Sequence, residues 1–446
     1  MQGPFRFFTP HGWRTARVKT GADGRITDLE TTAESMAPWA LPGIPNTHSH
    51  AFQRAMAGMT ERLGDPADSF WTWREQMYRF AGRLDPEAQY AIAAQLYVEM
   101  LEAGYTSVCE FHYLHHQPDG RPYADPAAMS QALIAAAADT GIRLTLLPVL
   151  YMSAGFDGRK LEPRQRRFGH DLDAVLSLVQ QLRRQENPLL HVGIALHSLR
   201  AVPESVMPAL LDAIAGETWP IHIHIAEQTI EVEQCLAARG ARPVRWLLDH
   251  APVDARWTLV HATHLSDDEV TGIADGGATV SICPTTEGNL GDGLFRLRDY
   301  LDAGGRFSIG SDSHISVSPV EELRWLEYGQ RLQARRRNIA ADADQSSTAA
   351  VLLQQAWQGG AAGAGFPVGR IEPTQLADWI SLDAKAPVLA GATPEDVLDR
   401  FVFAGNHNLI DTVQVGGRQW VEGGRHREHE RFARGYHAAI ERLLSD

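Results

Sequence analysis

Eight short apolar runs rich in β-branched residues recur along the chain, separated by alanine- and leucine-rich stretches with helical spacing. The runs are residues 41–50, 106–113, 143–151, 191–199, 220–228, 257–265, 278–287 and 306–314. Two parallel strands need a long crossover connection between them, and this connection is usually a helix. Strands that alternate with helices along the chain therefore indicate a parallel sheet. This alternation restricts the chain to a parallel α/β architecture.

Polar residues gather at the C-terminal end of run after run. HSH closes the first run at residues 48–50, and SDSH closes the last at residues 311–314. A doubly wound open sheet does not explain this repetition. In a barrel the same ends converge on one mouth, which is where active sites lie. We therefore predict an α/β fold with a (β/α)8 TIM-type barrel over residues 42–371.

The two ends of the chain have a different pattern. Residues 20–30 (TGADGRITDLE) and 411–424 (DTVQVGGRQWVEGG) combine strand-like pieces with the Gly and Asp turns of small antiparallel sheets. We predict that residues 1–41 and 372–446 pair into a small β domain beside the barrel.

Charge and cysteine content exclude several classes of partner. The net charge of −14 argues against a surface for nucleic acid or an anionic membrane, so an anionic ligand would need local arginines. Neither a signal peptide nor an apolar span of membrane length is visible. Three cysteines, without close-spaced pairs, suit a reducing compartment. We expect a cytoplasmic protein.

Histidines at the strand ends have the spacing of metal ligands. His48 and His50 lie two residues apart, so their side chains share one face of the first strand. His222 and His224 share a face of the fifth strand, and His224 is nearer the mouth. Asp312 ends the eighth strand, which adjoins the first in a closed barrel. We expect His48, His50, His224 and Asp312 to bind one Zn²⁺ or Fe²⁺ ion together.

The lysine content favours a site with a single metal ion. The chain has only Lys19, Lys160 and Lys385, and none lies in the fourth strand, residues 191–199. Binuclear barrel hydrolases commonly use a carboxylated lysine there to bridge two ions. The absence of such a lysine favours a mononuclear centre.

Three further side chains are candidates for proton transfer. A divalent ion lowers the pKa of bound water toward 7, and Asp312 is placed to take its proton. Glu227, three residues after His224, could protonate a departing nitrogen as general acid. His261, at the end of the sixth strand, could orient water or stabilise developing charge.

These residues resemble a known family. PGIPNTHSH, HIAEQ, VHATH and SDSH, in this order, are similar to the amidohydrolase superfamily, in its deaminase-like branch with one metal. More particular segments resemble the formimidoylglutamate deiminases of histidine degradation: FQRAMAG, SFWTWREQMY, EFHYLHH, LHSLRAVP and SDSHISVSPVEELRWLEYGQRL. The resemblance implies hydrolysis of N-formimidoyl-L-glutamate to N-formyl-L-glutamate and ammonia, by a homodimer.

The resemblance also implies a set of substrate-binding residues: Gln53, Arg74, Tyr113, His197 and Arg200. The physical logic agrees for the arginines, because a dicarboxylate calls for guanidinium groups that bind carboxylates in a planar, bidentate way. Which arginine would bind which carboxylate stays open.

Two other functions compete with this one. A deaminase of purines, pyrimidines or adenosine-like substrates in the same branch would want an apolar base pocket and amide contacts rather than arginines. A catalytically inactive scaffold would have lost one or more of the metal or proton-transfer residues, and all are present.

Overall fold

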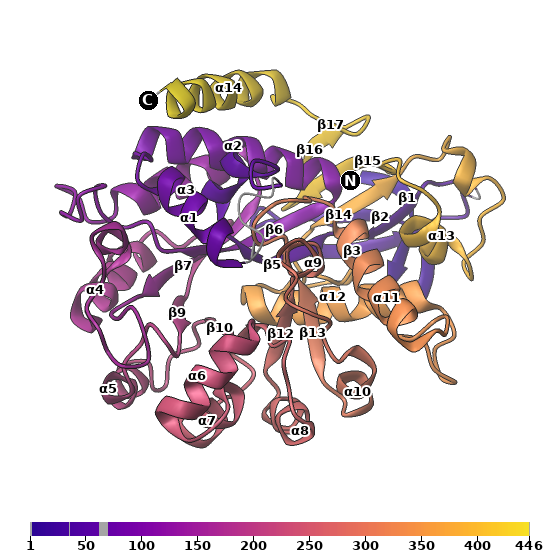
Figure 1. The fold of residues 1–446 in the computed structure, drawn as a ribbon. Helices are drawn as coiled ribbons and strands as arrows, with labels where there is room; N and C mark the ends of the chain where they lie inside the picture. Colours follow the sequence, from indigo (N-terminus) through magenta and orange to yellow (C-terminus); the bar gives the residue numbers. More distant parts are fainter. Residues whose placement is uncertain (1, 35, 62–69, 446) are drawn as a thin grey trace.

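The computed structural model describes residues 2–34, 36–61 and 70–445, and its larger sheet is a barrel (Figure 1). The barrel strands are β5 (Ile44–Ser49), β6 (Tyr105–His112), β7 (Arg143–Leu150), β8 (Leu190–Val192), β9 (Ile194–Ser198), β10 (Ile221–Ile225), β11 (Trp257–His261), β12 (Thr279–Ile282) and β13 (Arg306–Ile309). They are parallel and follow the chain order from β5 to β13, with β8 beside β7. The predicted TIM-type barrel is confirmed, and the fourth run forms both β8 and β9.

The residues just after β13 meet the C-terminal end of β5. The N–H of Asp312 donates to the carbonyl of His48 at 3.0 Å, and the N–H of His50 donates to the carbonyl of Asp312 at 3.2 Å. Ser49 and Asp312 form an isolated parallel bridge. The seam that closes the barrel therefore contains three of the four predicted metal ligands.

Helices surround the barrel and follow its strands (Figure 1). They are α1 (Phe70–Ala81), α2 (Pro86–Ala103), α3 (Ala128–Thr140), α4 (Leu172–Arg183), α5 (Met207–Ala213), α6 (Thr229–Arg239), α7 (Pro243–His250), α8 (Asp267–Gly276), α9 (Pro284–Leu290), α10 (Leu297–Asp302), α11 (Pro319–Ala334) and α12 (Thr348–Ala364). Short 3-10 helices are η1 (Ala51–Met56), η2 (Pro163–Phe168), η3 (Glu204–Val206) and η4 (Pro387–Leu389). None of the helices in the described ranges is long and apolar enough to cross a membrane.

Local sequence explains where these helices begin, end and approach the strands. Asp85 caps α2 by accepting the N–H of Ala88 at 2.8 Å, and Gly104 ends the helix with a φ of 101°. In α12, a Cβ at Gly359 would lie 2.1 Å from the carbonyl oxygen of Phe307 in β13. Glycine at this position therefore lets α12 pack directly on the barrel strand.

The two ends of the chain form a second sheet, as predicted. Its strands are β1 (Gln2–Thr9), β2 (Gly12–Thr20), β3 (Ile26–Thr31), β4 (Trp39–Pro42), β14 (Trp379–Leu382), β15 (Ile410–Val415), β16 (Arg418–Glu422) and β17 (Arg425–His426). The ends meet where β4 pairs antiparallel with β14. Helix α13 (Val397–Phe403) follows β14, and α14 (His429–Ser445) lies along α2 of the barrel (Figure 1). The predicted limits of this small domain include residues 1, 35 and 446, which lie outside the described ranges.

A buried ion pair joins the small sheet to the barrel. Arg143, at the start of β7, is 0% exposed and donates from Nε and Nη2 to the two carboxylate oxygens of Asp378, at 2.8 and 2.7 Å. Asp378 lies just before β14 and also accepts the N–H of Gly416 at 2.7 Å. Each partner needs the other, because an unpaired buried charge is strongly unfavourable.

Replacing Asp378 should therefore destabilise the protein markedly. We expect Asp378→Ala to lower the free energy of unfolding by about 3–5 kcal/mol, because it leaves the Arg143 guanidinium buried without its partner. Urea denaturation checks this value. The control is Asp249→Ala, which breaks an exposed pair with Arg245 on α7 and should cost under about 1 kcal/mol. Equal losses in the two variants would contradict the role given to the buried pair.

Candidate metal centre and active site

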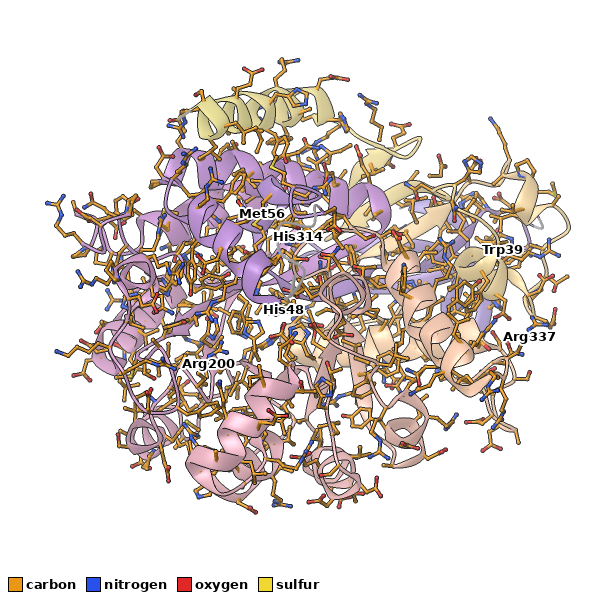
Figure 2. All side chains as sticks on the ribbon, viewed as in Figure 1. Trp39, His48, Met56, Arg200, His314 and Arg337 are labelled. Atoms are coloured by element: carbon orange, nitrogen blue, oxygen red, sulfur yellow. The ribbon has the colours of Figure 1, made fainter. Side chains whose placement is uncertain are left out.

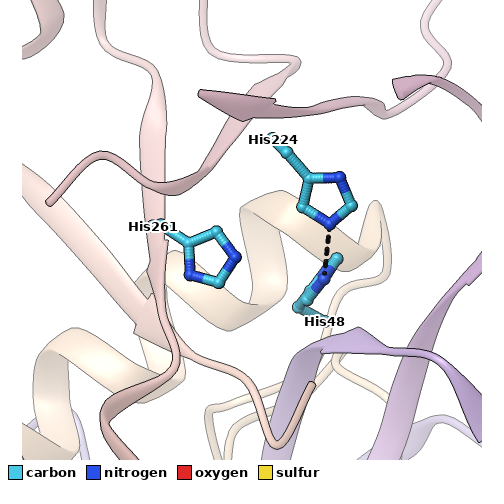
Figure 3. Close-up of side chains that lie close together, drawn as sticks. All are labelled: His48, His224 and His261. Carbon is cyan, nitrogen blue, oxygen red and sulfur yellow. Dashed lines mark hydrogen bonds between the residues drawn. The ribbon is translucent and has the colours of Figure 1, made fainter. Parts of the chain in front are cut away.

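Four predicted ligands meet at the mouth of the barrel. Nε2 of His48 lies 3.2 Å from Nε2 of His50 and 3.0 Å from Nε2 of His224. Oδ1 of Asp312 lies 3.3 and 3.4 Å from Nε2 of His48 and His50. Figure 3 shows His48 and His224 approaching nitrogen to nitrogen, with His261 beside them. These four separations are close to the roughly 3.3 Å between neighbouring ligands of a tetrahedral zinc site. His48, His50 and Asp312 form one cluster of mutually close ligand atoms, and His48, His224 and His261 form a second cluster.

The protonation of these imidazoles shows that the site suits a cation. Nδ1 of His50 donates to the carbonyl of Phe111, and Nδ1 of His224 donates to the carbonyl of His197, each at 2.9 Å. Their Nε2 atoms therefore carry lone pairs that point at Nε2 of His48. One hydrogen on His48 could satisfy only one of the neighbours, whereas a divalent ion would satisfy all of them.

Burial also favours the metal-binding form of these histidines. It lowers the pKa of His50, and it lowers the pKa of His48 and His224 well below the usual value. Neutral imidazole is the form that binds metals.

Glu110, which the sequence analysis did not single out, holds the loop that carries His50. It is 1% exposed and accepts hydrogen bonds from Oγ of Ser49 and the N–H of Ala51, both at 2.6 Å. Burial raises the pKa of this carboxyl to about 7. The sequence feature that could have indicated Glu110 is its position as an acidic residue inside the apolar run of β6.

The proposed proton-transfer residues lie beside the metal ligands. Nε2 of His261 is 3.8 Å from Oε1 of Glu227 and 3.9 Å from Oδ2 of Asp312. Its Nδ1 lies 3.2 Å from Oε1 of Glu287, another residue that the sequence analysis missed. Glu287 is held by the N–H of Cys283 at 2.9 Å. The imidazole is thus oriented from behind while Nε2 faces the cavity.

The pKa shifts of Glu227 and His261 suit these two residues to different roles. Burial raises the pKa of Glu227 to about 7, so this carboxyl can exchange a proton near neutral pH. Burial lowers the pKa of His261, but the carboxylates of Glu227, Glu287 and Asp312 outweigh this and raise the pKa to about 10. His261 is therefore suited to stabilise negative charge.

Backbone strain is concentrated at the same place. Ala226, His261 and Asp312 have φ angles of 52°, 69° and 45°, in the left-handed region that non-glycine residues rarely adopt. They follow or end β10, β11 and β13. Such strain persists only where the surrounding structure holds it, and it is typical of functional sites.

One cavity brings the predicted substrate-binding residues to the metal ligands. Gln53 comes from η1, Arg74 from α1, Tyr113 from the end of β6, and His197 and Arg200 from the end of β9, and all five line it. Figure 2 labels His48 near the barrel centre and Arg200 on the side toward α5. Among the described lining residues, Arg74 and Arg200 are the arginines and no lysine is present. The other lining residues were not among the residues predicted from the sequence: Trp73, Met77, Tyr78, Tyr151, Phe168, Ser198, Gln228, Ile230, Glu231 and Leu290.

Lone pairs that converge where a cation fits, beside groups able to move protons, are characteristic of a metal-dependent hydrolase. Comparison with known proteins agrees with this class. The model of the amidohydrolase family matches residues 39–420, and the chain belongs to this family.

Individual relatives resemble the chain over nearly its whole length. A formimidoylglutamate deiminase of Pseudomonas aeruginosa is 48% identical over 446 residues, which cover 98% of each chain. The crystal structure of an amidohydrolase from Brucella melitensis has a TM-score of 0.91 and 43% identity, again over 98% of each chain. A 5-methylthioadenosine/S-adenosylhomocysteine deaminase of Natronomonas pharaonis is 26% identical over 412 residues, which cover 92% of this chain and 86% of the relative.

The ligand set leads to a prediction about metal content. We expect one tightly bound divalent ion per chain, because the predicted ligands gather around His48 and no lysine lies in β9 to bridge a second ion. Elemental analysis after exhaustive dialysis measures this, and two stoichiometric ions would contradict it. Asp312→Asn should abolish turnover, whereas Asp302→Asn, at an exposed position of α10, should leave turnover unchanged.

Proposed function

We propose that this enzyme hydrolyses N-formimidoyl-L-glutamate to N-formyl-L-glutamate and ammonia, as a step of histidine degradation. The observation that carries the proposal is one cavity that is lined both by predicted metal ligands (His50, His224 and Asp312) and by two arginines (Arg74 and Arg200). A substrate with one amidine-type carbon and two carboxylates matches both features. The 48% identity to the Pseudomonas aeruginosa deiminase supports the same substrate.

The metal centre that we propose uses His48, His50, His224 and Asp312. Nitrogen and carboxylate ligands suit Zn²⁺ best, and Fe²⁺ is compatible with the same set. When bound, the ion would make water nucleophilic at neutral pH and polarise the carbon that is attacked.

The protein's own groups carry the protons. Asp312 accepts a proton from the attacking water, and Glu227 donates a proton to the nitrogen that leaves as ammonia. The raised pKa of Glu227 keeps a proton available to it near pH 7. His261, held by Glu287, stabilises the negative charge that develops during the attack.

Recognition of the substrate falls to the other wall of the cavity. Arg74 and Arg200 bind the two carboxylates by charge-assisted hydrogen bonds. Tyr113 accepts a hydrogen bond from Nε2 of Gln53 at 2.9 Å, so these two side chains support one another as substrate contacts. His197, whose carbonyl accepts a hydrogen bond from His224, lines the same cavity with its ring 5.2 Å from the ring of His224. We further propose a cytoplasmic homodimer without nucleic-acid or membrane partners, which suits the net charge of −14.

Glu227→Gln should lower kcat by about 10²- to 10⁴-fold, because an amide cannot supply the proton that ammonia needs to depart. Steady-state ammonia release measures the loss, and circular dichroism checks that the fold is retained. Glu233→Gln, at an exposed position of the adjacent helix α6, is the matched control and should have full activity. A loss below about threefold in Glu227→Gln would remove Glu227 from the mechanism.

Arg74→Met and Arg200→Met should each lower kcat/KM for N-formimidoyl-L-glutamate by at least roughly tenfold, because each loses a charge-assisted contact of about 1.5–3 kcal/mol. Metal content should be unchanged. Arg79→Met, at an exposed position of α1, is the control and should behave like the unmodified enzyme.

The same assay separates the leading function from its competitor. The competing function is deamination of a purine, a pyrimidine or an adenosine-like substrate, so guanine, cytosine and adenosine are the substrates to compare. Ammonia release from each is compared with release from N-formimidoyl-L-glutamate under one set of conditions. Faster turnover of a nucleobase or nucleoside would overturn the proposal, because a neutral base makes no use of the two arginines.

A further inference from the structure

Two tyrosines of the cavity wall share one buried glutamine. Tyr78 lies in α1 and Tyr151 directly after β7, and both line the cavity. Gln165, in η2, is 1% exposed, and its Nε2 lies 3.1 Å from Oη of Tyr78 and 3.3 Å from Oη of Tyr151. Segments from three parts of the chain therefore meet at one amide group.

The hydrogen bond that the side-chain oxygen of Gln165 accepts fixes the direction of the two bonds to the tyrosines. Oε1 of Gln165 accepts the N–H of Glu162 at 2.9 Å, within the capping box of η2. The amide NH₂ group must therefore face the tyrosines, and it has one hydrogen for each hydroxyl. Both tyrosine oxygens act as acceptors toward Gln165.

Arg74 adds two more donors to the same oxygen. Its Nε and Nη2 lie 2.9 and 2.6 Å from Oη of Tyr78. An arginine has no acceptor, so it cannot take the hydroxyl hydrogen of Tyr78. Among the described residues, no group accepts the hydroxyl hydrogen of either tyrosine.

A molecule bound in the cavity can supply this acceptor, because both tyrosines line the cavity. Tyr78 and Tyr151 are 7% and 3% exposed, and a buried donor without an acceptor is unfavourable. The positive charge at this position comes from Arg74, whose guanidinium carbon lies 5.2 Å from the ring centre of Tyr78. Arg164 lies 4.5 Å from the same ring centre, but its charge is paired with Glu75 and Glu162. An acceptor with negative charge fits best.

We propose that Tyr78 and Tyr151 bind substrate, donating their hydroxyl hydrogens to the same carboxylate that Arg74 binds, and that Gln165 is the positioning residue that turns both hydroxyls toward it. This inference rests on the proposed function, and it extends the recognition site beyond Gln53, Arg74, Tyr113, His197 and Arg200. A neutral amide in place of that carboxylate would offer only one acceptor oxygen to several donors. The group formed by Tyr78, Tyr151 and Arg74 therefore selects for an anion.

The test combines single hydroxyl deletions with substrates that lack one carboxylate. Tyr78→Phe and Tyr151→Phe should each raise KM for N-formimidoyl-L-glutamate about tenfold with little change in kcat, because the lost contact is remote from the reacting carbon. Gln165→Met should raise KM in the same way although both hydroxyls are retained. Tyr90→Phe, which removes a hydroxyl bound to Asp139 outside the cavity, is the control and should change neither constant.

Selectivity distinguishes a substrate contact from a structural effect. The unmodified enzyme, Arg74→Met and Tyr78→Phe are compared on N-formimidoyl-L-glutamate, N-formimidoyl-L-glutamine and the corresponding α-amide. Tyr78→Phe should reduce the preference for the dianion over one of the two amides, and it should be the same amide as for Arg74→Met. Equal losses on all three substrates would overturn the inference and leave a structural role for Tyr78.

Binding of glutarate, measured by calorimetry, keeps this inference separable from the proposed function. Weaker glutarate binding by Tyr78→Phe than by Tyr90→Phe supports the carboxylate contact, even where the unmodified enzyme releases no ammonia from N-formimidoyl-L-glutamate. Normal turnover by the unmodified enzyme, with unchanged KM and glutarate affinity in both cavity tyrosine variants, would overturn the inference and leave the proposed function standing.

Discussion

The backbone pairing between Asp312 and the end of β5 is the interaction on which the site depends. The residues that exchange N–H and C=O groups across the closing seam include three of the four predicted metal ligands. Closure of the barrel therefore brings these predicted ligands together. A register shift at this seam would turn His48 and His50 to the other face of the strand, because side chains alternate with a period of two.

Polar groups behind the ligands make this arrangement tolerable inside an apolar barrel. The carbonyls of Phe111 and His197 orient two imidazoles, Glu110 holds the loop after β5, and Glu287 orients His261. Buried polar groups are stable only when they are paired, and hydrogen bonds are stronger in such a low-dielectric environment. This outer layer fixes which nitrogen of each ring faces the cavity, and so it determines the chemistry available there.

Charge divides the cavity between reaction and recognition. Carboxylates and imidazoles line the part of the cavity that contains the predicted metal ligands. Arg74 and Arg200 lie on the wall formed by α1 and the end of β9. On a protein with a net charge of −14, these local cations are what makes an anionic ligand acceptable. In the proposed function, this division means that the groups that bind the substrate are separate from the groups that react with it.

The sequence alone determined the barrel and the pairing of the chain ends, and it predicted which histidines and which aspartate lie together at the barrel mouth. These features follow from periodicity, because strands alternate with helices and side chains two apart share a face. It also indicated Glu227 and His261, since both follow strand ends that converge on one mouth. Only the tertiary structure placed Glu110, Glu287, Tyr78, Tyr151 and Gln165 in the site and paired Arg143 with Asp378. Those contacts join residues up to 235 positions apart, and they depend on how loops and helices pack around the finished barrel rather than on any local repeat.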